Sequence, residues 1–90
     1  MEPQEISSRL LALLTAIAPD IDAAAVDPNR DLRDQFDFDS MDALHFATAI
    51  SKEFGIDIDE RDAAQLSAIG KAGQYVAAKL ASRALSAPGT

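Results

Sequence analysis

The densest group of potentially reactive side chains in the 90-residue chain surrounds a single serine, Ser40. Asp37, Asp39 and Asp42 lie within three residues of it, and residues 31–42 together hold five carboxylates and one arginine. Such a group could bind a cation, activate the serine as a nucleophile, or present the serine hydroxyl for attachment of another group. The spacing of the neighbouring residues tests each possibility.

A calcium loop requires oxygen ligands at positions 1, 3 and 5, glycine at position 6 and glutamate at position 12. Loops that start at Asp37 or at Asp57 lack the residues needed at positions 5, 6 and 12. The chain also has no cysteine, which excludes a thiolate metal site. We therefore expect no metal site in this protein.

A serine hydrolase would need His45 as its base, because His45 is the only histidine in the chain. Five residues at about 100° each place Ser40 and His45 about 140° apart on a helix, so their side chains point to different sides. The Gly-x-Ser-x-Gly motif is absent as well. We expect no catalytic residue, and we expect His45 to be an exposed or partly exposed helix residue.

Ser40 also stands where a helix is predicted to begin, and its hydroxyl could serve either of two purposes. An exposed serine in the first turn could carry a phosphate, because the unpaired N–H groups and the helix dipole favour an anion there. The same hydroxyl could instead only help to cap the helix. The local pattern favours capping and leaves attachment open.

Four helices are predicted from apolar residues that recur at helical spacing. They cover residues 3–18, 40–54, 60–66 and 68–85, with Asp39, Asp59 and Ser67 as N-caps. Asp42 is expected to complete a capping box with Asp39, and Gly55 to end the second helix in a left-handed conformation. The residues after the fourth helix, 86–90, are expected to fray.

The predicted helices bury one apolar face each, and the long loop between the first two packs on the core through its own apolar side chains. A short helical turn is possible in that loop within residues 20–26. The expected core residues are Ile6, Leu10, Leu13, Leu14 and Ile17 in the first helix, Val26, Leu32, Phe36 and Phe38 in the loop, Met41, Leu44, Phe46, Ala47, Ile50 and Phe54 in the second helix, and Ile69, Ala72, Val76 and Leu80 in the fourth.

The chain carries 8 Lys+Arg and 15 Asp+Glu, a formal net charge of −7. This charge excludes nucleic-acid binding, which requires clustered basic residues, and electrostatic attachment to anionic membranes. No apolar run approaches the ~20 residues of a membrane span, and the first residues lack the features of a secretory signal. We therefore expect a cytoplasmic, monomeric, all-α domain over residues 1–85, with basic partners and no membrane insertion.

The residues around the serine resemble the signature of the acyl carrier protein family, which is Asp-Ser-Leu at the start of the second helix. Here Met41 replaces the leucine, a change that conserves volume. The resemblance extends over about residues 5–82 and implies a four-helix bundle of the acyl-carrier type, with a long first loop and a short third helix. The segments that carry it are Asp39-Ser40-Met41-Asp42, Phe54-Gly55-Ile56, Ile58-Asp59, Leu66, Ile69 and Tyr75-Val76.

This resemblance implies that Ser40 carries 4′-phosphopantetheine, which a phosphopantetheinyl transferase moves from coenzyme A onto the hydroxyl. Acyl groups would then be tethered as thioesters on the thiol of the arm, and the carrier itself would catalyse nothing. Asp39 would flank the attachment site and aid recognition by the transferase. Loading ligases or transferases and synthases with basic patches would recognise the exposed face, for which the candidates are Asp37, Met41, Asp42, His45 and Asp62.

The sequence departs from carriers of fatty-acid synthesis in the placement of its acids, which lie before and after the second helix rather than along it. The pair Asp37-Phe38 also stands where the family often has glycine and a small apolar residue. These departures favour a specialised acyl pathway, such as polyketide synthesis, as much as fatty-acid synthesis. An aminoacyl or peptidyl carrier and an unmodified acidic helical adaptor are the alternatives.

The many alanines in the second and fourth helices have two interpretations. Alanine is the best helix former, which is reason enough for its abundance. Small side chains could also leave a crevice between helices for a bound acyl chain. The alanines concerned are Ala43, Ala47, Ala49, Ala72 and Ala77.

Overall fold

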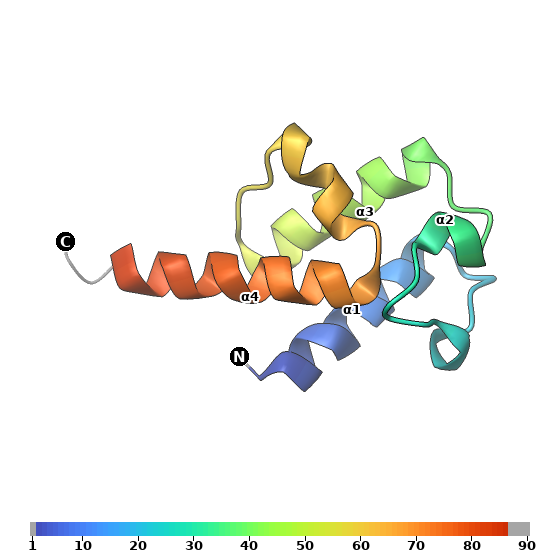
Figure 1. Cartoon of the computed structure of the whole chain (residues 1–90), viewed down its shortest axis with the longest axis horizontal. Helices are drawn as coiled ribbons and strands as arrows, with labels where there is room; N and C mark the ends of the chain where they lie inside the picture. Colours follow the sequence, from blue (N-terminus) through green and yellow to red (C-terminus); the bar gives the residue numbers. More distant parts are fainter. Residues whose placement is uncertain (1, 87–90) are drawn as a thin grey trace.

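The computed structural model describes residues 2–86, and it describes side chains as far as residue 82. This part of the chain folds into helices joined by loops and contains no strand, which confirms the prediction of an all-α helical bundle. In order along the chain, the elements are α1 (Pro3–Ile17), η1 (Ala23–Ala25), α2 (Leu32–Gln35), α3 (Ser40–Phe54), η2 (Glu60–Leu66) and α4 (Ile69–Ser86). Figure 1 shows α4 along the longest axis, with its C-terminal end projecting beyond the other helices.

The hydrophobic core lies where α1, α3 and the first half of α4 meet. Each helix contributes side chains at spacings of three or four residues, as one face of a helix requires. Phe38, from the loop before α3, packs edge-to-face against Phe46, with 6.2 Å between ring centroids. The fully or nearly buried residues of the three helices are Ile6, Leu10 and Leu14 in α1, Phe46, Ile50 and Phe54 in α3, and Ile69, Ala72, Tyr75 and Val76 in α4.

The long loop between α1 and α3 is held on the core, as predicted, and it contains two short helices. Leu32 in α2 is completely buried and Phe38 is nearly so. The Gln35 side chain accepts a hydrogen bond from the Asp27 N–H (2.7 Å) and donates one to the Asp27 carbonyl (2.8 Å). The Gln35 side chain thus pairs both backbone groups of Asp27, which have no partner in a helix or strand.

Two backbone hydrogen bonds tie this loop to the start of α4. The Leu32 N–H donates to the Ser67 carbonyl (2.8 Å), and the Gly70 N–H donates to the Pro28 carbonyl (2.8 Å). A Cβ at Gly70 would lie only 2.8 Å from the Pro28 oxygen, so glycine permits this approach. The loop that leads to Ser40 is thus held on the core by backbone hydrogen bonds and by the buried side chains of Leu32 and Phe38.

The predicted apolar face of α3 is wrong in its first two turns. Met41 and Leu44 are 59% and 57% exposed, whereas Phe46 is 1% exposed. Nine residues at about 100° each place Met41 on the opposite side of the helix from Ile50, and Leu44 lies about 120° from it. The core therefore covers the side centred on Ile50, and the two N-terminal apolar residues face outward.

The remaining differences from the predicted elements are small. α1 ends at Ile17, one residue early, because Pro19 restricts Ala18. α4 begins at Ile69, so Ala68 rather than Ser67 stands at the N-cap position, and its carbonyl accepts the first helical bond from Ala72. Ser86 belongs to α4, and the rest of the predicted tail, residues 87–90, lies outside the described residues.

Candidate functional site

The N-terminus of α3 is closed by a capping box, as predicted. The Asp42 N–H donates to Asp39 Oδ1 (2.9 Å), and the Asp39 N–H donates to Asp42 Oδ2 (3.3 Å). Asp39, with extended backbone, is the N-cap residue, and Ser40 is the first residue of the helix. Capping is therefore done by the two aspartates, and the interpretation of Ser40 as a capping residue is wrong.

Ser40 is exposed, and within residues 2–86 its hydroxyl makes no hydrogen bond. The N–H groups of Ser40 and Met41 also lack an acceptor among the described residues, because the capping box uses the N–H groups of Asp39 and Asp42 instead. A helix N-terminus with free N–H groups favours an anion. The local geometry thus suits a phosphate ester on Ser40 Oγ.

A groove of about 480 Å³ begins at Ser40 and runs between α3 and η2. On α3, the lining residues recur every three or four positions from Ser40 to Lys52, a distance of about 18 Å along the helix. Small or apolar side chains form much of its walls, namely Ala43, Leu44 and Ala47 of α3, Ile58 before η2 and Ala63 of η2. The groove is an open channel beside the candidate attachment residue.

The interpretation of the alanines as walls of a crevice agrees with the structure for two of them, both in α3. Ala43 and Ala47 line the groove, but the facing element is η2 and its preceding segment rather than α4. Ala72 is completely buried in the core, and Ala77 is exposed on the surface of α4. The alanines of α4 therefore serve close helix packing and the surface, whereas two of those in α3 shape the groove.

The structure separates the residues predicted to recognise partners into two sets. Met41 and His45 are exposed on α3, and Asp37 is exposed in the loop just before it. Asp42 is half-buried in the capping box, close to Ser40. Asp62 is half-buried in η2, where its Oδ2 accepts a hydrogen bond from the Tyr75 hydroxyl (2.8 Å). Asp62 thus joins η2 to α4, and the recognition role of all five residues stays a prediction.

Sequence reasoning missed two residues beside Ser40. Leu44 was assigned to the core, although its rotation relative to Ile50 places it on the exposed side. Arg33, in α2, lines the groove together with Ser40 and also lines a smaller hollow with Asp37 and Asp39. The only signal for Arg33 in the sequence was its position as the single arginine of the acidic segment 31–42.

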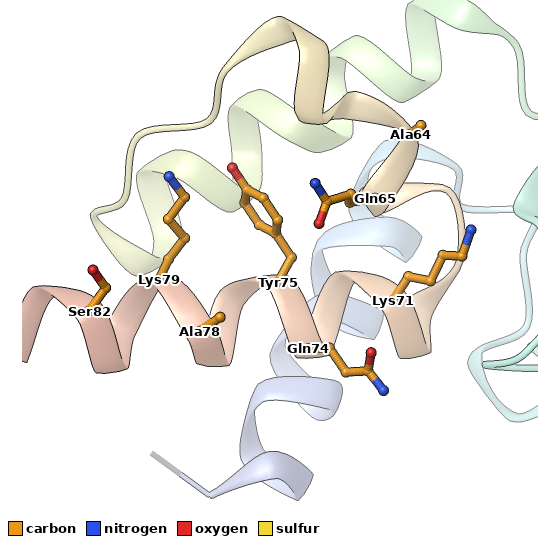
Figure 2. A pocket seen from close by; sticks show the side chains of 8 residues that line it. All are labelled: Ala64, Gln65, Lys71, Gln74, Tyr75, Ala78, Lys79 and Ser82. Carbon is orange, nitrogen blue, oxygen red and sulfur yellow. The ribbon is translucent and has the colours of Figure 1, made fainter.

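A second hollow, of about 620 Å³, lies between η2 and α4 and does not include Ser40. Figure 2 shows Lys71 and Lys79 on either side of Tyr75 along α4. The Lys79 ammonium lies 5.5 Å from the centre of the Tyr75 ring. Burial, the hydrogen bond to Asp62 and the charges of Asp62 and Asp59 raise the pKa of Tyr75 from 10.0 to about 12, because each of them disfavours the tyrosinate anion. The hollow contains no residue predicted to react.

The described residues 2–86 were also compared with what a metal site and a membrane-spanning helix require. In that part, histidines and acids do not gather in threes at any point that could hold a metal ion. The described helices include none with the length and apolar character needed to cross a membrane.

Comparison with known proteins assigns the family. A family model described as "Phosphopantetheine attachment site" matches residues 8–76. The chain is 33% identical over 60 residues to an acyl carrier protein from Picosynechococcus sp., covering 67% of this chain and 74% of that protein. It is 32% identical over 59 residues to an acyl carrier protein from Solidesulfovibrio magneticus, covering 66% and 76%.

A longer relative is a mitochondrial protein from Schizosaccharomyces pombe, provisionally named as an acyl carrier protein. It is 28% identical over 72 residues, which are 80% of this chain, and the match spans 64% of the length of the yeast protein. The family match covers most of the chain and includes α3 with its capping box. From the family model and these relatives together, we conclude that the chain is a member of the acyl carrier protein family.

Proposed function

We propose that this protein carries acyl groups on a 4′-phosphopantetheine arm attached to Ser40. In the attachment step, Ser40 Oγ bonds to the phosphorus of the pantetheine half of coenzyme A, and the pyrophosphate P–O bond breaks. Adenosine 3′,5′-bisphosphate leaves, and the serine hydroxyl releases its proton. The bound arm supplies a thiol that holds acyl groups as thioesters, which the chain itself cannot do because it has no cysteine.

The observation that carries this proposal is the state of the Ser40 hydroxyl. It is exposed and makes no hydrogen bond within the described residues, because Asp39 and Asp42 cap α3 in its place. A serine that only capped the helix would itself accept a hydrogen bond from a backbone N–H. The Ser40 hydroxyl accepts no such bond, so it is free to enter the active site of a phosphopantetheinyl transferase.

The groove between α3 and η2 supports an acyl cargo. It begins at Ser40, and its alanine and leucine side chains offer an apolar surface without blocking the channel. Burial of a chain's methylene groups against such a surface stabilises the complex by up to ~0.8 kcal/mol for each CH₂ removed from water. These apolar side chains are the part of the groove that would hold a hydrocarbon cargo.

The partners in this proposal are the transferase, an acyl-loading ligase or transferase, and synthases. Met41, Leu44 and His45 form an exposed surface next to Ser40, which we call the recognition surface. Acidic residues before and after α3 would steer basic enzymes toward it. The protein serves fatty-acid, polyketide or another acyl pathway as a cytoplasmic monomer, and catalysis belongs to the partner enzymes.

Intact mass spectrometry tests the attachment. We expect the protein that is coexpressed with a broad-specificity phosphopantetheinyl transferase to gain the mass of one phosphopantetheinyl group. Ser40→Ala should show no gain, whereas Thr48→Ala, which removes another exposed hydroxyl of α3, should be modified like the wild type. An unmodified wild type would favour the acidic adaptor, and modification of Ser40→Ala would show that another residue is the acceptor.

A further inference from the structure

We propose that Arg33 is the cationic partner of the phosphodiester that forms on Ser40, an inference that rests on the proposed attachment at this residue. The position of the side chain suggests it. Arg33 lines the groove that begins at Ser40, and it also lines the smaller hollow bordered by Asp37 and Asp39. The guanidinium-bearing side chain thus lies beside the first turn of α3, although it comes from a different helix.

The fold holds the backbone of Arg33 in place and leaves its side chain available. The neighbouring Leu32 is completely buried, and its N–H donates to the Ser67 carbonyl. The Arg33 N–H donates to Asp31 Oδ1 (2.9 Å), which caps α2. The residue itself is exposed. Because the backbone of Arg33 is already fixed, only the side chain loses conformational freedom when its guanidinium binds an anion.

The charges around Ser40 create a need for such a cation. A phosphodiester adds one negative charge close to the carboxylates of Asp37, Asp39 and Asp42, which repel it. Arg33 is the only base within residues 31–42. Within the described residues it makes no ion pair, since the two pairs found there join Arg9 to Glu53 and Arg61 to Asp59. Its guanidinium is therefore free for the phosphate.

Geometry favours Arg33 over the other cation of the groove. Lys52 lines the opposite end, twelve residues and about 18 Å along α3 from Ser40. A guanidinium can donate two parallel hydrogen bonds to two phosphate oxygens, which an ammonium cannot match. The N–H groups of Ser40 and Met41, which lack an acceptor among the described residues, supply donors from the helix side. Arg33 and α3 would then hold the phosphate between them.

Nuclear magnetic resonance of the unmodified and modified protein tests this contact directly. We expect the Arg33 Nε–H resonance to shift when the arm is attached. Arg30 is the matched control, because it belongs to the same loop but does not line the groove, and its side chain donates to the Asp34 carbonyl. Its resonance should not move. In the modified protein, Arg33→Gln should shift the phosphorus-31 resonance, and Arg30→Gln should leave it unchanged.

The outcomes separate this inference from the proposed function. If the wild type gains the arm but the Arg33 Nε–H and the phosphorus resonances do not respond, Arg33 does not hold the phosphate and only this inference fails. If Arg33→Gln merely slows modification and leaves the phosphorus resonance in place, Arg33 contacts the transferase instead, and the inference fails again. A wild type without any phosphorus signal would overturn the attachment and this inference together. Thermal unfolding of each unmodified variant shows whether it folds.

Discussion

Both sides of α3 carry large apolar residues, but one side is buried in the core and the other is exposed to solvent. Phe46 and Phe54 are 1% and 5% exposed and pack in the core, whereas Met41 and Leu44 are 59% and 57% exposed. A single exposed apolar residue needs no explanation, but two within one turn beside the candidate attachment residue form a small apolar surface. The comparison teaches that α3 stabilises the bundle with the side that carries Phe46, Ile50 and Phe54, whereas the exposed side with Met41 and Leu44 is available to the partners that we propose.

The largest difference between these sides should appear in stability. Phe54→Ala removes a buried aromatic side chain and should lower the free energy of unfolding by about 3–5 kcal/mol, because it leaves a cavity. Leu44→Ala, on the exposed side, should change it by less than about 0.5 kcal/mol. Chemical denaturation of both variants measures the difference. Equal losses would mean that α3 is rotated relative to the structure described here.

Changes in the recognition surface should affect partner enzymes although they hardly affect stability. Leu44→Ala should lower kcat/KM for modification by the transferase about tenfold, which corresponds to about 1.4 kcal/mol of lost contact with the enzyme. Gln74→Ala changes an exposed residue of the other hollow and should not alter this rate. Initial rates at low carrier concentration measure the effect. An unchanged rate for Leu44→Ala would remove this residue from the recognition surface.

The capping box should contribute a smaller amount to the stability of the exposed end. Asp39→Ala removes the acceptor of the Asp42 N–H and should lower the free energy of unfolding by about 1 kcal/mol. Asp37→Ala, two residues earlier and exposed, should have less than half of that effect. Thermal unfolding of the two variants provides the test. If Asp39→Ala were neutral, the hydroxyl of Ser40 would be able to cap the helix after all.

An effect confined to alkaline pH concerns the far wall of the groove, which the Tyr75–Asp62 hydrogen bond joins to α4. The pKa of Tyr75 is raised from 10.0 to about 12, so the folded protein favours the protonated phenol. Its contribution to stability is therefore complete below pH 10 and is lost as the pH rises from 10 to 12. The free energy of unfolding of Tyr75→Phe should therefore fall less between pH 10 and 12 than that of the wild type. Because Tyr75 is the only tyrosine, tyrosinate absorbance reports its pKa directly, and a value near 10 would contradict the burial of this group.

The sequence predicts those features of α3 that depend on neighbouring residues. Asp39 and Asp42 form the capping box, and Gly55 ends the helix in the left-handed conformation (φ 63°), because each of these depends on local backbone chemistry. The exposure of Met41 and Leu44 depends on how α3 is rotated against α1 and α4. Helical spacing alone does not give that rotation when apolar residues cover more than one side.

Within the candidate site, the motif around Ser40 indicates the serine as the candidate attachment residue but does not predict its surroundings. The position of Arg33 depends on hydrogen bonds between the first loop and the start of α4, such as the one from Leu32 to Ser67, which join residues far apart in the sequence. The second wall of the groove likewise depends on the packing of η2 against α3. Tertiary contacts of this kind leave no periodic signal in the sequence.

The most direct test of the account is to locate the added group within the modified protein. Proteolysis and fragmentation of the peptide that contains residues 39–42 would identify the residue that bears the phosphopantetheinyl group. Our account predicts that the group lies on Ser40 and that every other hydroxyl in the chain is unmodified. Modification at a different residue, or a modified protein whose Ser40 is unaltered, would contradict it.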